Sequence, residues 1–355
     1  MRRMRAAVLR EYGEGPSIEQ VDRPAVGQRD ALVAVEACGV CRSDWHAWQG
    51  HGDWADDRVE PGQVLGHEPA GRIVEVGADV AELQEGDRVA VPFCLGDGTC
   101  RYCRSGHGNV CPDGLALGFE RAAGGALAEY VRLPWAEFNA IRLPSSVEFR
   151  EAAALGCRFM TAFHGLAHRV DPDPGAWAVV VGCGGVGLSA VQVADALGLR
   201  VIAADVESRK LERASGLGAT ETVDAGDEDV PEAVSSMTGD GAAVSVDAVG
   251  RAETCRAAVD ALRPTGTHLQ LGLTTDAERG EVPLPTDRMT MTAQSFVGSR
   301  GMPPSRADEL VGLVESGTVD PGALVGRELS LSDVPDRLAA MTDYDTEGVE
   351  VVTEF

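Results

Sequence analysis

Short runs that alternate apolar and polar residues characterise the first part of the chain. Residues 32–37 (LVAVEA), 71–77 (GRIVEVG) and 87–93 (DRVAVPF) each show this period of two. The alternation is typical of a strand buried on one face, because successive side chains of a strand point to opposite faces. Glycine and proline are frequent between the runs, for example at Gly86. The first 150 residues are therefore predicted to form an irregular antiparallel β domain.

The pattern changes after about residue 151. Residues 177–182 (WAVVVG) form a continuous apolar run, typical of a strand that is buried on both faces of a sheet. The apolar positions that follow have the spacing of one helix face and are Ala190, Val193, Ala194 and Leu197. Residues 200–205, 244–250 and 267–273 continue the alternation of strands with helical segments. This order predicts a doubly wound parallel sheet.

The composition is that of a globular protein with about two domains. The chain has 355 residues, of which 44% are hydrophobic and 25% are charged, and this length suits roughly two domains. No apolar run approaches the roughly 20 residues of a membrane helix. The apolar stretch at residues 6–9 is too short for a signal peptide. We therefore expect a cytoplasmic protein.

The net charge is strongly negative, at -25 with an isoelectric point near 4.6. Nucleic acids and anionic membranes require a basic surface, so neither is an expected partner. Lys210 is the only lysine, and all other basic residues except histidine are arginine. This bias fits either a salt-adapted cytoplasm or a GC-rich genome.

Nine cysteines are present, and four of them lie between Cys94 and Cys111. Clustered cysteines in a cytosolic chain indicate a metal site more often than disulfides. Cys100, Cys103 and Cys111 have the C-x2-C-x7-C spacing of a zinc knuckle. Because a structural zinc takes four ligands, the knuckle needs one more residue.

A glycine-rich segment, VVVGCGGVGLSA, connects the first of the buried strands to its helix. Gly182, Gly184 and Gly187 fit the G-x-G-x-x-G motif, with Gly185 and Val186 between them. The motif alone is weak in a chain with 43 glycines, but the strand–turn–helix context predicts dinucleotide binding. The three motif glycines permit a tight turn, close approach of the pyrophosphate and close helix packing. Free N–H groups at the start of the helix then face the phosphates.

Asp205 ends the second buried strand, 18 residues after Gly187. A carboxylate at this point accepts hydrogen bonds from the ribose hydroxyls and repels a 2′-phosphate, so NAD is predicted over NADP. Arg209 and Lys210 leave NADP open, because a cation can bind that phosphate. The alternative, that Asp205 and Lys210 are solvated surface charges, is disfavoured by the complete strand–turn–helix–strand context. Further cofactor-contact candidates, in the segments of the two later strands, are Val249 and Leu273.

Three further segments carry candidate metal ligands. They are residues 39–50 (GVCRSDWHAWQG), 66–71 (GHEPAG) and 156–166 (GCRFMTAFHGL). With the cysteine knuckle and GCGGVG, in this order, they make the chain resemble the zinc-dependent medium-chain alcohol dehydrogenases over almost its whole length. The resemblance implies an α/β protein with a GroES-like irregular β catalytic domain and a Rossmann domain.

The tail after about residue 297 contains one more helical stretch and a final strand-like run, EGVEVV. Periodicity alone does not place this tail. The resemblance implies that it returns to the catalytic domain, which would comprise residues 1–150 and 297–355. The Rossmann NAD-binding domain would comprise residues 151–296.

The resemblance also implies that Cys41, His67 and Cys157 hold a catalytic zinc, with water or substrate in the fourth position. Two thiolates and a neutral imidazole leave the site near zero formal charge, and the open position can bind an alcohol oxygen. Bound zinc lowers the pKa of that hydroxyl, and the alkoxide can then transfer hydride to the nicotinamide. Taken singly, Cys157 could be a buried thiol and His67 a core histidine. The ordered set of motifs argues against those readings.

The resemblance assigns roles to several other residues. Ser43 would take the alcohol proton, and His46 would pass it to solvent. Asp44 would orient the histidine ligand, and Glu68 would approach or transiently bind the zinc. Cofactor contacts implied in the same way are Arg42 to the pyrophosphate, Thr161 to the nicotinamide and Lys210 to the adenosine ribose. Histidines without such a match, interpreted as structural, are His51, His164 and His168.

In the family that the chain resembles, the knuckle holds a structural zinc with C-x2-C-x2-C-x7-C spacing. Here Asp97 stands at the first position. A carboxylate oxygen is an acceptable zinc ligand, so the preferred set is Asp97, Cys100, Cys103 and Cys111. Cys94, three residues earlier, is the rival to Asp97, and a metal-free knuckle is a third alternative. With the catalytic site, two zinc ions per chain are expected.

The predicted activity is that of a zinc- and NAD-dependent alcohol dehydrogenase, which interconverts alcohols with aldehydes or ketones. Its expected partners are a small-molecule substrate and further copies of the chain, in a dimer or tetramer. Candidates for an apolar substrate wall, which could equally be core aromatics, are Trp48, Trp54, Phe93 and Phe119. Two alternatives stay open: a polyol or sugar dehydrogenase on the same scaffold, and a dinucleotide-binding protein without dehydrogenase activity.

Overall fold

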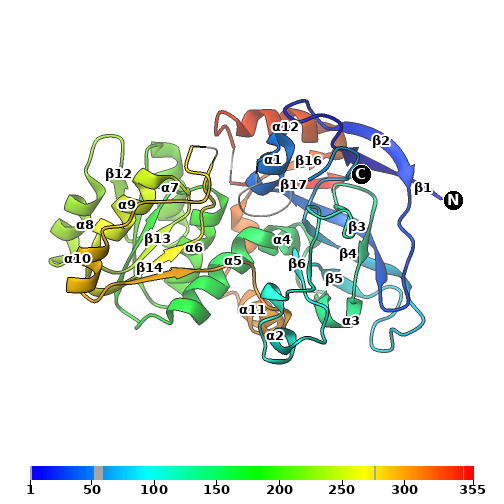
Figure 1. Cartoon of the computed structure of the whole chain (residues 1–355), viewed down its shortest axis with the longest axis horizontal. Coiled ribbons are helices and arrows are strands. Elements are labelled where there is room, and N and C mark those ends of the chain that lie inside the picture. Colours follow the sequence, from blue (N-terminus) through cyan, green and yellow to red (C-terminus); the bar gives the residue numbers. More distant parts are fainter. Residues whose placement is uncertain (1, 52–58, 276, 347) are drawn as a thin grey trace. The chain divides into compact units, whose positions relative to one another are not determined.

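The chain forms two compact units (Figure 1). The computed structural model describes residues 2–51, 59–275, 277–346 and 348–355. Unit 1 comprises Met1–Met160 and Gly301–Phe355, and unit 2 comprises Thr161–Arg300. The C-terminal tail therefore belongs to the same unit as the N-terminal part of the chain.

Unit 2 is built on a six-stranded parallel sheet of order β12-β11-β10-β13-β14-β15. The strands are β10 (Trp177–Val181), β11 (Arg200–Asp205), β12 (Glu221–Asp224), β13 (Ala242–Asp247), β14 (Leu262–Gln270) and β15 (Ser295–Gly298). The chain winds outward in one direction from β10 and in the other from β13, which is the strand order of a Rossmann fold. This confirms the predicted doubly wound parallel sheet. Ligands bind such sheets at the carboxyl ends of the strands, where the winding direction reverses.

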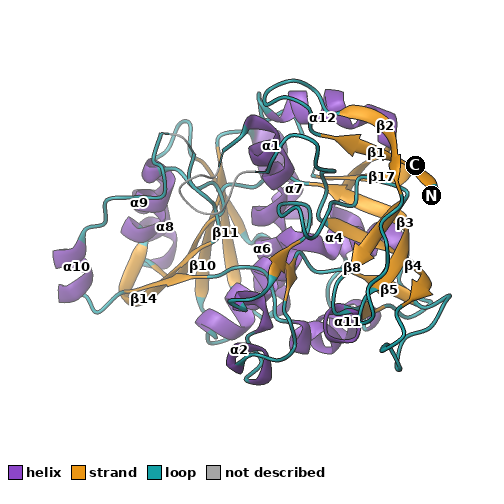
Figure 2. Cartoon of the chain, turned by 45° about the vertical axis from the view of Figure 1, so that its right-hand side comes forward, coloured by secondary structure: helices purple, strands orange, loops and turns teal. Residues whose placement is uncertain are grey.

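Unit 2 also contains helices, the first of which begins at the last residue of the N-terminal segment of unit 1. They are α5 (Met160–His164), α6 (Gly185–Ala196), α7 (Ser208–Gly216), α8 (Val230–Thr238), α9 (Ala252–Asp260) and α10 (Thr286–Met291). In Figure 2, α8 and α9 lie on one side of β10 and β11, and α6 lies on the other. The buried face of α6 includes Ala190, Val193 and Ala194, as their spacing predicts. The sheet itself contributes Val179 and Ile202, both fully buried, to the apolar core.

Unit 1 contains a seven-stranded sheet of order β16-β17-β3-β4-β5-β9, with β8 also paired to β3. Its strands are β3 (Ala31–Val40), β4 (Glu68–Val76), β5 (Arg88–Ala90), β8 (Tyr130–Leu133), β9 (Ile141–Arg142), β16 (Val325–Ser330) and β17 (Val349–Glu354). The three alternating runs of the sequence correspond to β3, β4 and β5, so these strand predictions are confirmed. The C-terminal strand β17 pairs antiparallel with β3, and Val351 lies opposite Gly39.

One pair in this sheet departs from the antiparallel expectation. Strands β16 and β17 are parallel, whereas all other pairs of this sheet are antiparallel. Parallel neighbours need a crossover connection, and the helix α12 (Val334–Met341) supplies it. The tail is too weakly patterned for its strand direction to be deduced from the sequence.

Smaller elements complete unit 1. They are β1 (Arg3–Val8), β2 (Ser17–Asp22), α1 (Arg42–Gln49), β6 (Cys94–Leu95), α2 (Arg101–Arg104), β7 (Leu115–Ala116), α3 (Ala136–Asn139), α4 (Phe149–Ala154) and α11 (Ala307–Glu315). Helix α4 and the π-helical turn η2 (Leu155–Phe159) contact β4. Because of these contacts, unit 1 extends to Met160, later than the expected boundary at residue 150.

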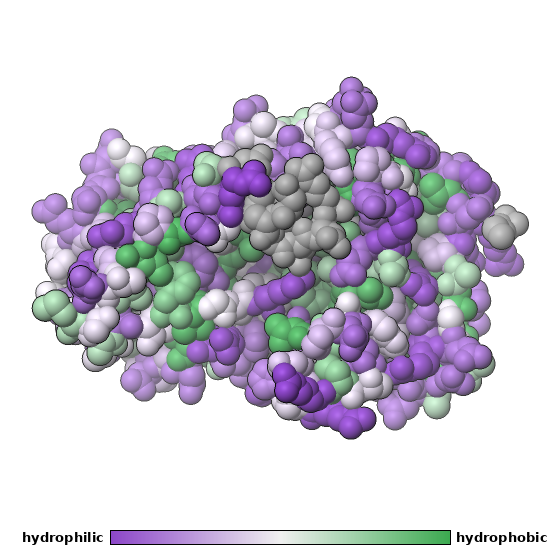
Figure 3. Space-filling model, viewed as in Figure 1, coloured by the Kyte–Doolittle hydropathy of each residue, from purple (hydrophilic) through white to green (hydrophobic). Residues whose placement is uncertain are grey.

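Hydrophilic side chains cover most of the face drawn in Figure 3, with apolar residues in smaller patches between them. This agrees with a net charge of -25. Within the described part of the chain, no helix has the length and apolar character needed to cross a bilayer.

Candidate metal centres and dinucleotide site

Four potential metal ligands that are distant in the sequence meet in unit 1. They are Cys41, His67, Glu68 and Cys157, and one ligand atom of each lies within 4.8 Å of those of the others. His67 and Glu68 are fully buried, and Cys41 is 3% exposed. The structure therefore brings together the three residues that the resemblance implies as catalytic zinc ligands, with Glu68 beside them.

Strand pairing places two of these ligands. Cys41 directly follows β3, and His67 directly precedes β4. Because β3 and β4 are antiparallel, with Gly39 opposite Glu68, the end of one strand lies beside the start of the other. Cys157 comes from the π-helical turn η2, where the backbone at Gly156 leaves helical geometry. Single π-helical turns of this kind often occur at functional sites.

Asp44 orients two members of this cluster. Its Oδ2 accepts a hydrogen bond from the backbone N–H of Cys41 at 2.9 Å, and its Oδ1 lies 2.8 Å from Nδ1 of His67. A carboxylate on Nδ1 holds the proton there and leaves Nε2 as an acceptor. Nε2 is buried and has no hydrogen-bond partner among the described residues. A buried imidazole nitrogen of this kind, beside two sulfurs, has the chemistry of a metal ligand.

A hydrogen bond links the two cysteines of the cluster. It lowers the pKa of Cys41 well below its usual value and raises the pKa of Cys157 well above it. Burial is the largest single effect and lowers the pKa of His67, but the Asp44 carboxylate and the Cys41 sulfur together raise it well above its usual value. The same sulfurs and imidazole become ligands once their protons are displaced by a metal.

The helix α1 carries the two residues expected to handle protons. Ser43 Oγ lies 3.8 Å from Cys41 Sγ. His46 Nδ1 lies 3.1 Å from Nδ1 of His51, and the rings of both histidines pack edge-on against Trp45. His51 was interpreted as structural from the sequence, and the structure shows that it is the direct neighbour of His46.

Arg42 is held within unit 1. Its guanidinium donates to the carbonyl of Met341 at 2.6 Å and stacks over the rings of Trp45 and Tyr344. The contact with pyrophosphate that the resemblance implies for Arg42 stays a prediction.

A second cluster lies in the knuckle. Its members are Asp97, Cys100, Cys103 and Cys111. Cys100 Sγ is 3.6 Å from each of the other two sulfurs, and Asp97 Oδ1 is 3.3 Å from Cys103 Sγ and 3.4 Å from Cys111 Sγ. Cys94 is not part of this cluster and lies in β6. The structure thus places Asp97, and not its rival Cys94, with the three cysteines.

The turn that contains Asp97 keeps its carboxylate ionised. Hydrogen bonds from the hydroxyl and backbone N–H of Thr99 lower the pKa of Asp97 well below its usual range, and the backbone N–H of Cys100 adds to the effect. Burial raises the pKa of Cys103 to about 12. A carboxylate that stays charged can stand in for the missing fourth thiolate.

The glycine-rich loop of unit 2 has the shape that its sequence predicts. Gly182 has a φ of +90°, a conformation that favours glycine. A Cβ on Gly187 would lie 1.7 Å from the carbonyl oxygen of Gly182, so no side chain fits there. A Cβ on Gly184 would meet no described atom within 4 Å, which leaves open space beside the N-terminus of α6. These three environments match the three roles of the motif.

Asp205 stands where the ribose of the cofactor is expected, and it is hydrogen-bonded to the glycine-rich loop. Its Oδ2 accepts from the backbone N–H of Cys183 at 2.7 Å, and its Oδ1 accepts from that of Glu207 at 3.0 Å. Glu207 in turn forms ion pairs with Lys210 and with Arg209. Arg209 and Lys210 are the two cations that could bind the 2′-phosphate of NADP. Both are therefore already paired with the carboxylate of Glu207.

The remaining cofactor candidates lie in unit 2. Val249 contacts the loop, since a Cβ on Gly182 would lie 2.3 Å from Val249 Cγ2. The backbone of Leu273 adjoins Gly250, and its side chain is exposed. Thr161 is buried in α5. Their contacts with a nucleotide stay predictions.

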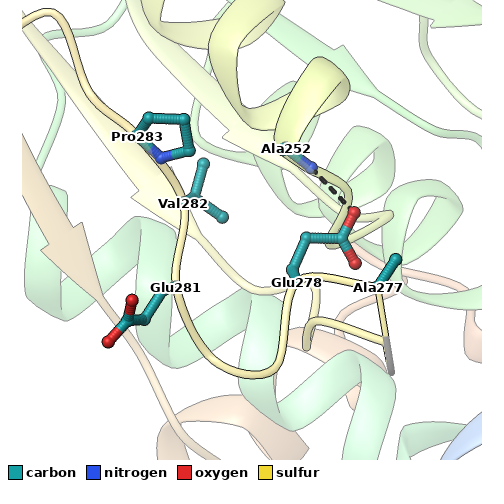
Figure 4. A pocket seen from close by; sticks show the side chains of 6 residues that line it. All are labelled: Ala252, Ala277, Glu278, Glu281, Val282 and Pro283. Atoms are coloured by element: carbon teal, nitrogen blue, oxygen red, sulfur yellow. Dashed lines mark hydrogen bonds between the residues drawn. The ribbon is translucent and has the colours of Figure 1, made fainter.

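A surface depression lies elsewhere in unit 2 (Figure 4). It is lined by Ala252, Ala277, Glu278, Glu281, Val282 and Pro283. Glu278 accepts a hydrogen bond from the backbone N–H of Ala252 at the start of α9. This residue therefore caps a helix, and neither metal cluster nor the glycine-rich loop contributes to the lining.

Comparisons with known proteins agree with this geometry. Residues 27–145 match the family described as alcohol dehydrogenase GroES-like domain, and residues 185–316 match the zinc-binding dehydrogenase family. The chain is 32% identical to an NAD-dependent alcohol dehydrogenase of Sulfurisphaera tokodaii, over 98% of this chain and 99% of that protein. The chain belongs to the zinc-dependent medium-chain alcohol dehydrogenase family. It is thus an oxidoreductase with a GroES-like and a Rossmann-type domain.

Two further relatives of this medium-chain dehydrogenase cover nearly all of it. A sorbitol dehydrogenase of Bacillus subtilis is 30% identical over 98% of this chain and 96% of that protein. The solved structure of alcohol dehydrogenase TADH from Thermus sp. ATN1 superposes with a TM-score of 0.90 at 31% identity, covering 98% and 99% of the two chains. The family is therefore shown over the full length, while the relatives differ in the substrates that their names state.

The aromatic residues considered for the substrate site of this dehydrogenase divide into different environments. Phe93 and Phe119 pack against His67, with ring centroids 5.9 Å and 4.8 Å away. Trp48 is 4% exposed and belongs to the apolar core, which supports the second of the two alternatives, a core aromatic, for this residue. Trp54 lies outside the described residues.

One residue in contact with the first cluster, Arg158, was not predicted from the sequence. Arg158 is buried and forms an ion pair with Glu68. Burial raises the pKa of Glu68 to about 7, against the opposing effect of Arg158. An arginine directly after a ligand, in the otherwise mostly apolar GCRFMTAF segment, was the signal that could have identified it.

Proposed function

We propose that this dehydrogenase catalyses reversible hydride transfer between an alcohol and NAD, and that Cys41, His67 and Cys157 hold its catalytic zinc. The observation that carries the proposal is the buried Nε2 of His67, which no described residue satisfies and which adjoins two cysteines. A polar atom buried without a partner is costly, and a metal would satisfy it. Bound zinc supplies a Lewis acid that acidifies the alcohol hydroxyl or polarises the carbonyl.

The chain's own groups handle the proton in this proposal. Ser43 Oγ accepts the proton of the alcohol hydroxyl and at the same time passes its own hydroxyl proton on towards His46, and its position beside Cys41 supports this role. His46 then releases the proton to solvent, directly or through its neighbour His51. His46 and His51 are both partly exposed, which suits exchange with water.

NAD is the proposed cofactor because the charged groups around the ribose position oppose a 2′-phosphate. Asp205 closes β11 at that position, and Glu207 adds a second carboxylate two residues later. Lys210 and Arg209 are paired with Glu207. A 2′-phosphate would have to displace that carboxylate and approach Asp205, and both steps are unfavourable.

We also propose a second, structural zinc bound by Asp97, Cys100, Cys103 and Cys111. The distances within the cluster and the lowered pKa of the Asp97 carboxylate support four-ligand coordination. A zinc analysis of the purified protein tests both sites at once. We expect about two zinc ions per chain, and a value near one would exclude the two-metal proposal.

The substrate class is proposed from the residues beside His67. Phe93 and Phe119 present apolar rings, which favours aliphatic or aromatic alcohols. The relative named sorbitol dehydrogenase makes a polyol substrate the second candidate. Initial rates with benzyl alcohol and cyclohexanol against sorbitol and glucose, each with NAD, separate the two. Binding of NADH without oxidation of any substrate in a broad panel would favour a non-catalytic dinucleotide-binding protein.

We further propose that the protein assembles into a homo-oligomer. Strand β15 is an edge of the unit 2 sheet and carries the partly exposed Phe296, and Met291 in the preceding α10 is 87% exposed. An edge strand with exposed apolar side chains can pair with, and pack against, a second copy of the chain. Light scattering after gel filtration measures the mass, and a monomer across micromolar concentrations would contradict the proposal.

A further inference from the structure

A single guanidinium connects the three segments that carry the proposed zinc ligands. Arg158 follows Cys157, and it bonds to Glu68, which follows His67, and to Val40, which precedes Cys41. The contacts are Nε to Glu68 Oε1 at 3.2 Å, NH1 to the carbonyl of Val40 at 3.2 Å, and NH2 to Glu68 Oε2. The backbone N–H of Arg158 also donates to Glu68 Oε1, at 3.3 Å.

The ion pair is enclosed by backbone. Glu68 is fully buried and Arg158 is 4% exposed. Gly39 and Gly156 leave no room on either side, because a Cβ on Gly39 would lie 2.2 Å from Glu68 Oε2 and one on Gly156 would lie 2.6 Å from Glu68 Cβ. A buried charge is strongly unfavourable without its partner. The carboxylate of Glu68 is therefore held where Arg158 binds it.

Glu68 is nevertheless close enough to bind the metal. A carboxylate oxygen of Glu68 lies within 4.8 Å of the ligand atoms of Cys41, His67 and Cys157. A fourth protein ligand would complete a tetrahedral zinc site and close it, as in structural sites. A catalytic site needs that position for the substrate oxygen.

We propose that Arg158 is a positioning residue that keeps Glu68 from becoming a permanent fourth zinc ligand, so that any approach of Glu68 to the zinc is transient and one coordination position stays open for substrate. The inference rests on the proposed zinc site. Arginine suits the task because its planar fork engages both carboxylate oxygens at once, while a further N–H binds the Val40 carbonyl. Lysine offers a point charge and cannot hold both oxygens in the same way.

Cobalt substitution with added imidazole tests the inference without measuring turnover. Cobalt(II) replaces zinc in the purified protein, and thiolate-to-cobalt absorption reports that the metal is bound. Imidazole is titrated as a ligand for the open position, and the visible bands are followed. The knuckle already offers four protein ligands, so the spectral response isolates the catalytic site.

The decisive variants are Arg158→Met, Glu68→Gln and the two combined. In Arg158→Met the carboxylate of Glu68 is released and takes the open coordination position of the metal. Half-saturation of the cobalt site should then need at least about tenfold more imidazole than in the unchanged protein. The double variant should recover the original response, because the amide of glutamine binds zinc poorly. If Arg158 has only a structural role, the single and double variants respond alike, and the inference is overturned.

One control and one alternative variant complete the test. Arg150→Met removes an exposed arginine that pairs with Glu328 and should leave the titration unchanged. If Arg158→Met does not fold, as judged by circular dichroism, Arg158→Lys keeps the charge but loses the fork, and should still need several times more imidazole. An unchanged titration in Arg158→Lys would then overturn the inference. Absence of a cobalt–thiolate band beyond that of the knuckle in the unchanged protein would instead refute the zinc site itself.

Discussion

Asp44 Oδ1 lies 2.8 Å from Nδ1 of His67, and both side chains are buried. The other oxygen of the same carboxylate accepts the backbone N–H of Cys41. One residue on the first turn of α1 therefore orients two of the three proposed zinc ligands.

Asp44→Ala should weaken binding of the catalytic zinc by about 10- to 100-fold, because residues that orient metal ligands typically contribute that much. Competition with a chromogenic chelator measures the affinity. Asp308→Ala, at an exposed position of α11, is the matched control and should not change it. Equal zinc affinity in the Asp44 variant would contradict the role of this carboxylate.

Cys41→Ser should abolish alcohol oxidation and remove one zinc per chain while the fold is kept. The metal there is proposed to be catalytic, and serine is a poor zinc ligand. Zinc analysis, circular dichroism and initial rates follow the three effects. Cys38→Ala changes a buried cysteine that lies outside both metal clusters and should keep the zinc. Persistent turnover in Cys41→Ser would show that the ligand set is wrong.

Ser43→Ala should lower the rate of alcohol oxidation by about 100-fold or more, since a positioned proton acceptor contributes on this scale. Zinc content and NADH affinity should be unchanged, because the hydroxyl binds neither in the proposal. Ser43→Thr keeps a hydroxyl at the same position and should retain most of the activity. Equal rates for the alanine and threonine variants would refute a proton-transfer role.

Asp205→Gly should weaken NADH binding and favour NADPH by about tenfold in the ratio of dissociation constants. Glu207→Gln should shift the ratio in the same direction but less, because it releases Lys210 and Arg209 without removing the ribose carboxylate. Fluorescence titration with each nucleotide measures both constants. Glu212→Gln, exposed on the same helix α7, is the control. A constant ratio in all variants would reject the charge argument.

Asp97→Ala should remove the structural zinc or make it much easier to extract with a chelator. Cys94→Ala should leave it in place, because Cys94 lies outside the cluster. Zinc retained after timed dialysis against EDTA compares the two variants. Loss of metal in Cys94→Ala alone would reverse the assignment.

The sequence was sufficient for the features that depend on neighbouring residues. The continuous apolar run before Gly182 and the helical spacing from Ala190 predicted the Rossmann unit, and both are present. The resemblance implied that the tail returns to the N-terminal part of the chain, and in the structure β17 pairs with β3. The local sequence pattern could not predict that β16 and β17 are parallel, because the direction of a strand depends on the connection that crosses over to it.

Within the candidate site, the resemblance to the family, which rests on the order of the motifs, implied Cys41, His67 and Cys157 as ligands, and the structure brings these three residues together. Tertiary structure alone decided which atoms meet: the bond of Asp44 to Nδ1 of His67, the place of Asp97 among the cysteines, and the enclosure of Glu68 by Arg158. Motifs record spacing along the chain, whereas hydrogen bonds and burial depend on contacts between segments far apart in it. Arg158 and Glu68 are 90 residues apart in the sequence, and only the folded sheet and its π-helical turn bring their charges together.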